Sequence, residues 1–235
     1  MFEEFSRIGK LLFQEGLVDA FGGSLSVRDG DSIFITKAFV MLGDLKKEDI
    51  LEVGLEPGDK DKEASLELNA HRAVYKQSKT QAIVNAYPAN AIAISLTDNK
   101  IVPQDGQGLA QFKAAPIVRV REGLGSEETK RLLPSFLNGS NVIAVVKGNG
   151  SFAAGQDLKE AYKYTSALEN SCKIIVAMRA SSKGQDRPER SSQDRGRAAS
   201  SDRARTNNRR SAIPPGLGVM DRSRSRSRER NNFRK

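Results

Sequence analysis

The chain changes character after Arg179. Up to that residue, apolar side chains recur at regular spacings, whereas Ser, Arg, Asp, Gln and Asn dominate afterwards and Phe233 is the only aromatic residue. A segment of this composition cannot bury enough apolar surface to offset the entropy that it loses on ordering. The sequence therefore predicts one folded domain over residues 1–179 and a disordered, basic, Arg/Ser-rich tail over residues 180–235.

The net charge is divided unevenly between these two parts. The tail holds 16 Lys+Arg and 6 Asp+Glu, a net charge of +10, out of chain totals of 38 and 29. The remaining 22 basic and 23 acidic residues give the domain a net charge of −1. The high isoelectric point thus describes the tail, and it says nothing about a pocket in the domain.

The first forty residues of the domain carry two local signals. Apolar residues at helical spacing predict an amphipathic helix between Phe2 and Phe13. Asp29-Gly30 lies between two strand-like segments, residues 24–28 and 32–36, and predicts a hairpin because a type I′ turn requires positive φ.

Helical and strand patterns then alternate along the rest of the domain. Further strands are expected at residues 82–86, 117–120 and 142–146. Helix starts are expected at Ser65, Pro88, Ser126 and Asp157, the last of these opening the longest helix, to about Met178. This interleaving indicates an α/β domain with a central mixed β-sheet covered by helices on both faces.

Cysteine usage and the N-terminus bear on the compartment. The single cysteine, Cys172, cannot form an intrachain disulfide, which favours a cytoplasmic protein. Residues 1–4 lack the basic region and apolar core of a signal peptide, and no apolar run approaches the ~20 residues of a membrane span. We therefore expect an intracellular protein without a membrane span.

Three short segments of the domain are residues 64–67 (Ala-Ser-Leu-Glu), 85–88 (Asn-Ala-Tyr-Pro) and 148–150 (Gly-Asn-Gly). With their surroundings they resemble the active-site motifs of the class II aldolase/adducin family. Family enzymes carry His-x-His-Pro at the second segment and Asn-His-Gly at the third. The similarity runs from about residue 3 to residue 176, and residues 151–169 match a family helix motif. It implies the family's three-layer fold.

The resemblance implies a zinc site whose ligands are missing. In family aldolases three histidines hold zinc, which stabilises an enediolate as a Lewis acid. The matching positions here are Asn85, Tyr87 and Asn149. A neutral amide binds zinc poorly, and a phenol with a pKa near ~10 must first lose its proton. We therefore expect no zinc and no other cofactor.

Two ionisable residues of one expected helix remain to be assigned. Glu67 matches the family's general acid/base, and two interpretations stay open: proton transfer by a tuned buried carboxylate, or an ordinary Glu near a helix start. His71, the only histidine, lies one helical turn later. In the family that position is not a zinc ligand, and we expect a structural residue hydrogen-bonded to its neighbours.

The phosphate-binding positions that the resemblance implies are altered. Family enzymes bring backbone N–H groups against a sugar phosphate at a Gly-Asn turn, a Ser/Thr-Gly pair and a Ser-Ser pair. The matches here are Gly23-Ser24, Ala38-Phe39 and Ser65-Leu66. Phe39 adds bulk and is expected to lose access to positive φ. Lys37 is a candidate for a compensating charge, with an exposed loop lysine as the alternative.

The tail contains an Arg-Ser run at residues 222–230 and further Arg-rich patches before it. Flexible arginines neutralise phosphates, so RNA, DNA or another polyanion is a candidate partner of residues 180–235. A solvated tail without a partner is the alternative.

Two functions follow from these observations. The first is a non-catalytic or strongly diverged binding and assembly module with a polyanion-binding tail, for which adducin offers an architectural precedent. Such a module is expected to be a homo-oligomer, and the family resemblance implies a tetramer. The second is an enzyme: an aldehyde-lyase (carbon–carbon lyase) or epimerase acting on a small sugar phosphate or hydroxy-carbonyl compound, with Glu67 as general acid/base. Beside these two functions, a third possibility is that the tail alone sets the function, as a nucleic-acid tether on an inert domain. Whether the chain is an enzyme stays open, although an active zinc aldolase is disfavoured.

Overall fold

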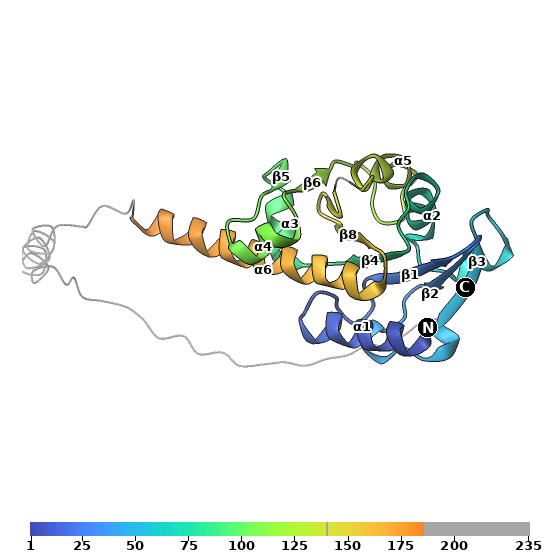
Figure 1. Cartoon of the computed structure of the whole chain (residues 1–235). Helices are drawn as coiled ribbons and strands as arrows, with labels where there is room; N and C mark the ends of the chain where they lie inside the picture. Colours follow the sequence, from blue (N-terminus) through green and yellow to red (C-terminus); the bar gives the residue numbers. More distant parts are fainter. Residues whose placement is uncertain (140, 186–235) are drawn as a thin grey trace, which may run out of the picture. The chain divides into compact units, whose positions relative to one another are not determined.

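A computed structural model describes residues 1–139 and 141–185 (Figure 1). Its α-helices are α1 (Phe2–Gln14), α2 (Leu68–Gln77), α3 (Ala89–Ser95), α4 (Gly106–Gln111), α5 (Glu127–Phe136) and α6 (Leu158–Gln185). Short 3-10 helices are η1 (Leu42–Asp44), η2 (Lys47–Asp49) and η3 (Asp59–Glu63). The strands are β1 (Ser24–Asp29), β2 (Ser32–Thr36), β3 (Ile50–Gly54), β4 (Ala82–Ala86), β5 (Lys100–Ile101), β6 (Ala115–Val118), β7 (Ile143–Val146) and β8 (Gly150–Gly155).

The strands of the described residues form one sheet in the order β3-β2-β1-β4-β8-β7-β6-β5. Neighbouring strands run antiparallel except for β6 and β7, which are parallel. A parallel pair needs a crossover connection, which α5 supplies here. The prediction of a central mixed sheet is confirmed.

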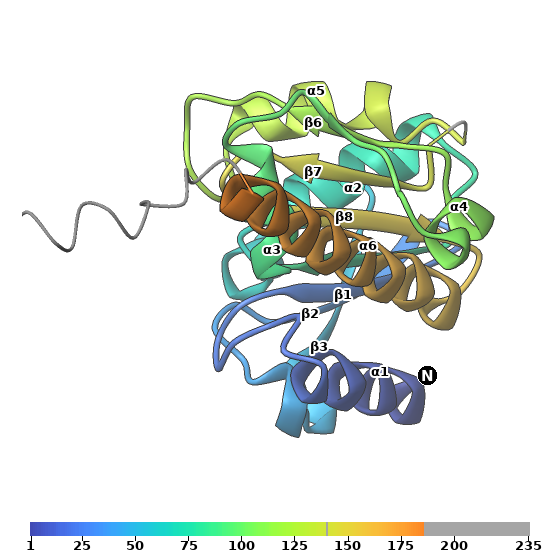
Figure 2. The ribbon, with the colours of Figure 1, turned by 90° about the vertical axis from the view of Figure 1, so that its left-hand side faces the viewer.

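Helices cover both faces of this sheet (Figure 2). On one face α1, α3, α4 and α6 close an apolar core that contains Phe5, Leu168 and Cys172. On the other face α2 and α5 close a second core, which contains Val74 and Leu133. The domain therefore has the predicted three layers. The Cys172 side chain is buried and packs within the first of these cores.

The predicted hairpin forms where the sequence places it. Strands β1 and β2 pair with Asp29 opposite Ser32, and Gly30 in the turn has φ +59°. In β2 the buried Ile33 and Ile35 alternate with the half-buried Ser32 and Phe34, so both isoleucines enter a core. This hairpin continues the sheet beyond β4, and Ser24, the first residue of β1, pairs with Asn85 of the motif segment.

The last strand and the last helix differ from the expectation. Residues 151–155 form most of β8 rather than part of a helix, because each of them pairs with β4 and lies in the sheet interior. The helix begins at Leu158, directly after the expected start at Asp157, whose Oδ1 accepts a hydrogen bond from the Glu160 backbone N–H, but it continues past the expected end near Met178 to Gln185. The boundary predicted at residue 179 therefore falls within α6, and the remainder of the predicted tail, residues 186–235, lies outside the described residues.

Candidate functional site

The motif segments meet around a cavity of about 320 Å³. Its lining consists of residues 19, 21–23, 37–39, 65–67, 85, 87 and 124. These residues lie in the connections before β1, after β2, before α2 and before α5, and at the end of β4. The sheet and its connections thus assemble the cavity from distant parts of the sequence.

Most of the candidate residues lie at this cavity. Those that line it are Gly23, Lys37, Ser65, Glu67, Asn85 and Tyr87. Ser24 does not line it, because its buried Oγ lies 3.1 Å from Nε2 of His71 on the inner side of β1. Asn149 does not line it either: its backbone N–H donates to the Val146 carbonyl in the turn between β7 and β8.

Glu67 is a buried carboxylate with one free oxygen. The residue precedes the first turn of α2 and is 5% exposed. Its Oε1 accepts a hydrogen bond from the backbone N–H of Gly125 at 2.9 Å, whereas Oε2 has no partner among the described residues. Burial raises the pKa of Glu67, and the Gly125 hydrogen bond partly opposes that rise.

The hydrogen bond between Gly125 and Glu67 depends on glycine at position 125. The sequence alone did not indicate this role for Gly125. Gly125 has φ +68°, and an added Cβ would lie 2.7 Å from the Leu66 carbonyl oxygen. A positive φ and a close backbone approach both favour glycine. The motif Gly123-Leu124-Gly125 was a visible signal of an unusual loop, although nothing in it pointed to Glu67.

His71 belongs to the protein interior. Its Nδ1 lies 2.7 Å from Ser26 Oγ, which in turn lies 2.7 Å from the Tyr75 hydroxyl. Together with the Ser24 contact, these bonds use both ring nitrogens. Complete burial lowers the pKa of His71 to about 3, so the ring is neutral at physiological pH. The structure thus agrees with a structural histidine.

Ser65 also differs from the expected role. The sequence places it at the N-terminus of a helix, but α2 starts three residues later, at Leu68. Its Oγ accepts a hydrogen bond from the Glu67 backbone N–H at 3.3 Å, which is a local turn rather than a helix cap. This turn contributes to the orientation of the Glu67 backbone at the cavity.

The family's zinc positions do not fit zinc in this chain. Asn85 uses its Nδ2 to donate to the Ser151 carbonyl at 3.2 Å, and Asn149 offers only another neutral amide. Burial, with Glu67 and Asp19 nearby, raises the pKa of Tyr87 to about 12, so its phenol keeps its proton. Zinc prefers imidazole, thiolate or carboxylate ligands. In residues 1–139 and 141–185, no three His, Cys, Asp or Glu side chains are grouped to hold a metal.

The Tyr87 ring is wedged between two glycines. A Cβ added at Gly22 would lie 2.7 Å from the ring atom Cδ2, and one added at Gly150 would lie 3.0 Å from Cδ1. The Tyr87 backbone N–H donates to the Leu17 carbonyl at 2.8 Å. Glycine on both sides therefore gives the large ring its space, at a position where family enzymes have histidine.

The backbone conformation of Phe39 differs from the expectation. It was expected to lose access to positive φ, but it adopts φ +61° with its side chain 69% exposed at the cavity. A left-handed conformation costs a non-glycine residue about 1–2 kcal/mol. The backbone thus retains a glycine-like conformation without glycine. Lys37 nearby forms an ion pair with Glu63 at 3.6 Å.

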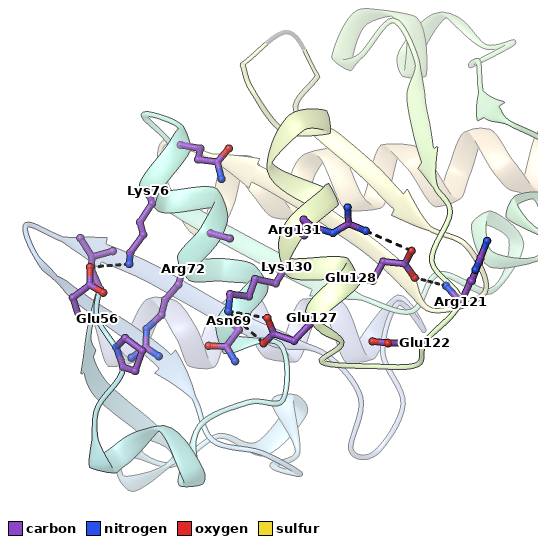
Figure 3. Close-up of a pocket in the computed structure, with 14 residues that line it drawn as sticks. Glu56, Asn69, Arg72, Lys76, Arg121, Glu122, Glu127, Glu128, Lys130 and Arg131 are labelled. Carbon is purple, nitrogen blue, oxygen red and sulfur yellow. Dashed lines mark hydrogen bonds and ion pairs between the residues drawn. The ribbon is translucent and has the colours of Figure 1, made fainter.

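A larger groove of about 960 Å³ lies between α2 and α5, away from the motif residues (Figure 3). Three of its basic side chains have acidic partners: Lys76 with Glu56, Lys130 with Glu127 and Arg131 with Glu128. Exposed pairs of this kind form a solvated, mutually neutralised surface. The groove therefore shows no chemistry comparable to that of the smaller cavity.

The prediction about membranes can be compared with the described helices. No helix within residues 1–139 and 141–185 combines the length and the apolar character that a membrane span needs.

Comparison with known proteins agrees with the motif analysis. Residues 3–176 match the family described as Class II Aldolase and Adducin N-terminal domain. An L-fuculose phosphate aldolase of Methanococcus maripaludis is 29% identical over 176 residues, which cover 74% of this chain and 96% of that protein. A methylthioribulose-1-phosphate dehydratase of Acidiphilium cryptum is 30% identical over 189 residues, 71% of this chain and 85% of the relative.

A solved structure shows the same arrangement. The crystal structure of L-fuculose-1-phosphate aldolase from Thermus thermophilus superposes with a TM-score of 0.74 and 31% sequence identity. The superposition covers 77% of this chain and 95% of that one. The similarity thus extends over most of this chain and nearly all of that structure.

Proposed function

Because the chain belongs to the class II aldolase and adducin N-terminal domain family, we propose that it is a zinc-free member, a binding and assembly module whose pocket takes a small ligand. The observation that carries this proposal is the donor set at the family's metal positions. Asn85 and Asn149 are neutral amides, and Tyr87 is a phenol whose pKa is raised to about 12. None of these groups replaces a zinc-binding imidazole.

The geometry around Tyr87 adds support. Gly22 and Gly150 leave just enough room for its ring, and the cavity beside it persists with a volume of about 320 Å³. A concave cavity lined by apolar side chains and a few polar groups is the usual form of a small-molecule site, which favours a binding role over an inert domain.

The second candidate function is catalysis by Glu67. A buried carboxylate with a raised pKa and a free Oε2 is typical of a general acid/base, and the relatives named above are an aldolase and a dehydratase of phosphorylated sugars. In this alternative the protein is an aldehyde-lyase or epimerase of a small sugar phosphate or hydroxy-carbonyl compound.

Turnover in the presence of a chelator separates the two candidates. Full-length protein is assayed with L-fuculose 1-phosphate and with methylthioribulose 1-phosphate, with and without EDTA. The binding-module proposal predicts no turnover above that of Glu67→Gln. Turnover that survives EDTA and disappears in Glu67→Gln, but not in the exposed control Glu122→Gln, would establish the enzyme instead.

Assembly and the tail belong to the same proposal. A homo-oligomer, a tetramer by family resemblance, would present several copies of the basic segment and gain avidity on RNA, DNA or another polyanion. Because α6 continues to Gln185, the informative truncation removes residues 186–235 and leaves the helix intact. Loss of salt-sensitive polyanion binding in that truncation is expected, and unchanged binding would contradict the tail's role.

A further inference from the structure

Four exposed apolar side chains surround the cavity. Phe21, Phe39, Leu66 and Leu124 are 62%, 69%, 51% and 48% exposed, and all four line the same opening. We call these four residues the apolar collar. They come from four separate connections, so the fold brings them together although the sequence does not.

The exposed apolar collar is unfavourable for the free protein in two ways. Exposed large apolar side chains gathered at one place are unfavourable in water and usually mark a binding site. Phe39 also carries the strain of its φ of +61°. Apolar contact with a bound group would offset both costs.

The inner end of the cavity has the opposite character. Glu67 Oε2 and Asn85 Oδ1 are buried acceptors with no hydrogen-bond partner among the described residues, and both residues line the cavity. A buried acceptor without a donor is destabilising, and most such atoms are satisfied in folded proteins. A ligand at this place is therefore favoured if it supplies N–H or O–H donors.

The charges at the cavity disfavour an anion. Asp19 and Glu67 are the acidic lining residues. The positive charge of Lys37 is shared with Glu63 at 3.6 Å. Phe39 also lines the cavity with an apolar ring, which has no hydrogen-bond donor to offer an anion. Both the electrostatics and the lining thus differ from those of a phosphate site.

We infer that this cavity binds a small amphipathic ligand that places an apolar ring or chain against the apolar collar and directs an amine or hydroxyl group toward Glu67 and Asn85. The inference rests on the proposed zinc-free function, and it names the ligand class of that same site. A second copy of this chain covering the apolar collar is the competing occupant.

A matched set of probes tests the ligand class. 2-Phenylethylamine, 2-phenylethanol and phenyl phosphate share a ring and differ in the polar end. Their affinities are measured by ligand-observed NMR titration of the full-length protein. We expect saturable binding of the amine and the alcohol, and phenyl phosphate weaker by at least about tenfold.

Two collar variants locate the binding. Phe39→Ala and Leu66→Ala should each lower the affinity for 2-phenylethylamine by about five- to tenfold, because each removes apolar contact with its ring. Leu109→Ala is the control, since Leu109 is 55% exposed but lies on α4 and does not line the cavity. Equal affinities in the two collar variants and the wild type would overturn the inference.

The remaining outcomes are also decisive. Phenyl phosphate binding as tightly as the amine, or no amine binding at all, overturns the ligand class. Dissociation of an oligomer by Phe39→Ala in analytical ultracentrifugation, without probe binding, assigns the apolar collar to a second copy instead. Zinc content and lyase turnover of the same sample test the proposed function separately, so metal-free, inactive protein that prefers phenyl phosphate contradicts only this inference.

Discussion

The backbone N–H of Gly125 donates a 2.9 Å hydrogen bond to Oε1 of Glu67, across 58 positions of the sequence. The bond joins the loop before α5 to the start of α2, and it leaves Oε2 as the free atom of the carboxylate. The loop before α5 thus fixes which oxygen of Glu67 is hydrogen-bonded and which is left buried without a partner among the described residues.

Replacing Gly125 by alanine should break this connection. The new Cβ would lie 2.7 Å from the Leu66 carbonyl at a φ of +68°, so the loop must shift and the hydrogen bond is lost. We expect a decrease of about 1–3 kcal/mol in the free energy of unfolding, measured by urea denaturation. Gly123→Ala is the matched control because nothing lies within 4 Å of its added Cβ, and an equal loss in both variants would contradict the account.

Glu67→Gln should stabilise the domain at neutral pH. The pKa of Glu67 is raised in the folded state by burial. Its contribution to stability is therefore most favourable below the unfolded pKa near ~4.3 and is lost as the pH rises through the folded pKa. The stability gained by Gln should grow from pH 4.5 to pH 7, as measured by thermal unfolding. A gain that is independent of pH, as expected for the exposed control Glu122→Gln, would argue against a buried, strained carboxylate.

His71 should stay neutral in the folded protein well below pH 6. Its folded pKa of about 3 lies below the ordinary histidine value of 6.5. The neutral His71 therefore makes its full contribution to the free energy of unfolding above pH 6.5. As the pH falls from 6.5 toward 3, this contribution decreases by up to about 1.4 kcal/mol per pH unit. Because the chain has one histidine, its imidazole signals in a ¹⁵N NMR titration need no assignment. An imidazole that titrates near pH 6.5 while the protein remains folded would contradict the buried network.

Phe39→Gly should leave the free energy of unfolding unchanged or raise it by up to about 1.5 kcal/mol. Glycine relieves about 1–2 kcal/mol of left-handed strain and costs about 0.5–1 kcal/mol in unfolded-chain entropy. Phe39→Ala removes the same ring but keeps a Cβ at φ +61°, so it should not show the gain. Denaturation of the two variants side by side measures the difference. A more stable alanine variant would mean that φ is not strained at this position.

Much of the fold could be predicted because its signals are local. The apolar spacing of α1, the Asp29-Gly30 turn and the Ser126 cap of α5 each act within a few residues, and the structure contains all three. Strand β8 was missed because residues 150–155 (Gly-Ser-Phe-Ala-Ala-Gly) are mostly small and show no regular alternation of polar and apolar residues, as expected of a strand buried on both faces. Its identity depends on its neighbours β4 and β7 rather than on its own pattern.

The candidate site could be predicted only in part, for a similar reason. Family motifs pointed to Glu67, Asn85 and Tyr87, which do lie together. The partners that define their environment, Gly125 and the side chain of Leu124, come from a loop whose approach depends on tertiary packing. The positive φ of Phe39 was missed because phenylalanine rarely adopts it, and only the surrounding structure imposes it.

The zinc content of purified full-length protein tests the central claim most directly. The protein is expressed with supplemented zinc, passed through size-exclusion chromatography and analysed by inductively coupled plasma mass spectrometry, with its oligomeric mass recorded on the same sample. The donor chemistry of Asn85, Tyr87 and Asn149 predicts far less than one zinc per chain in an intact assembly. About one zinc per chain, lost when Asn85 and Tyr87 are replaced by alanine, would contradict the zinc-free account and return the pocket to metal-dependent chemistry.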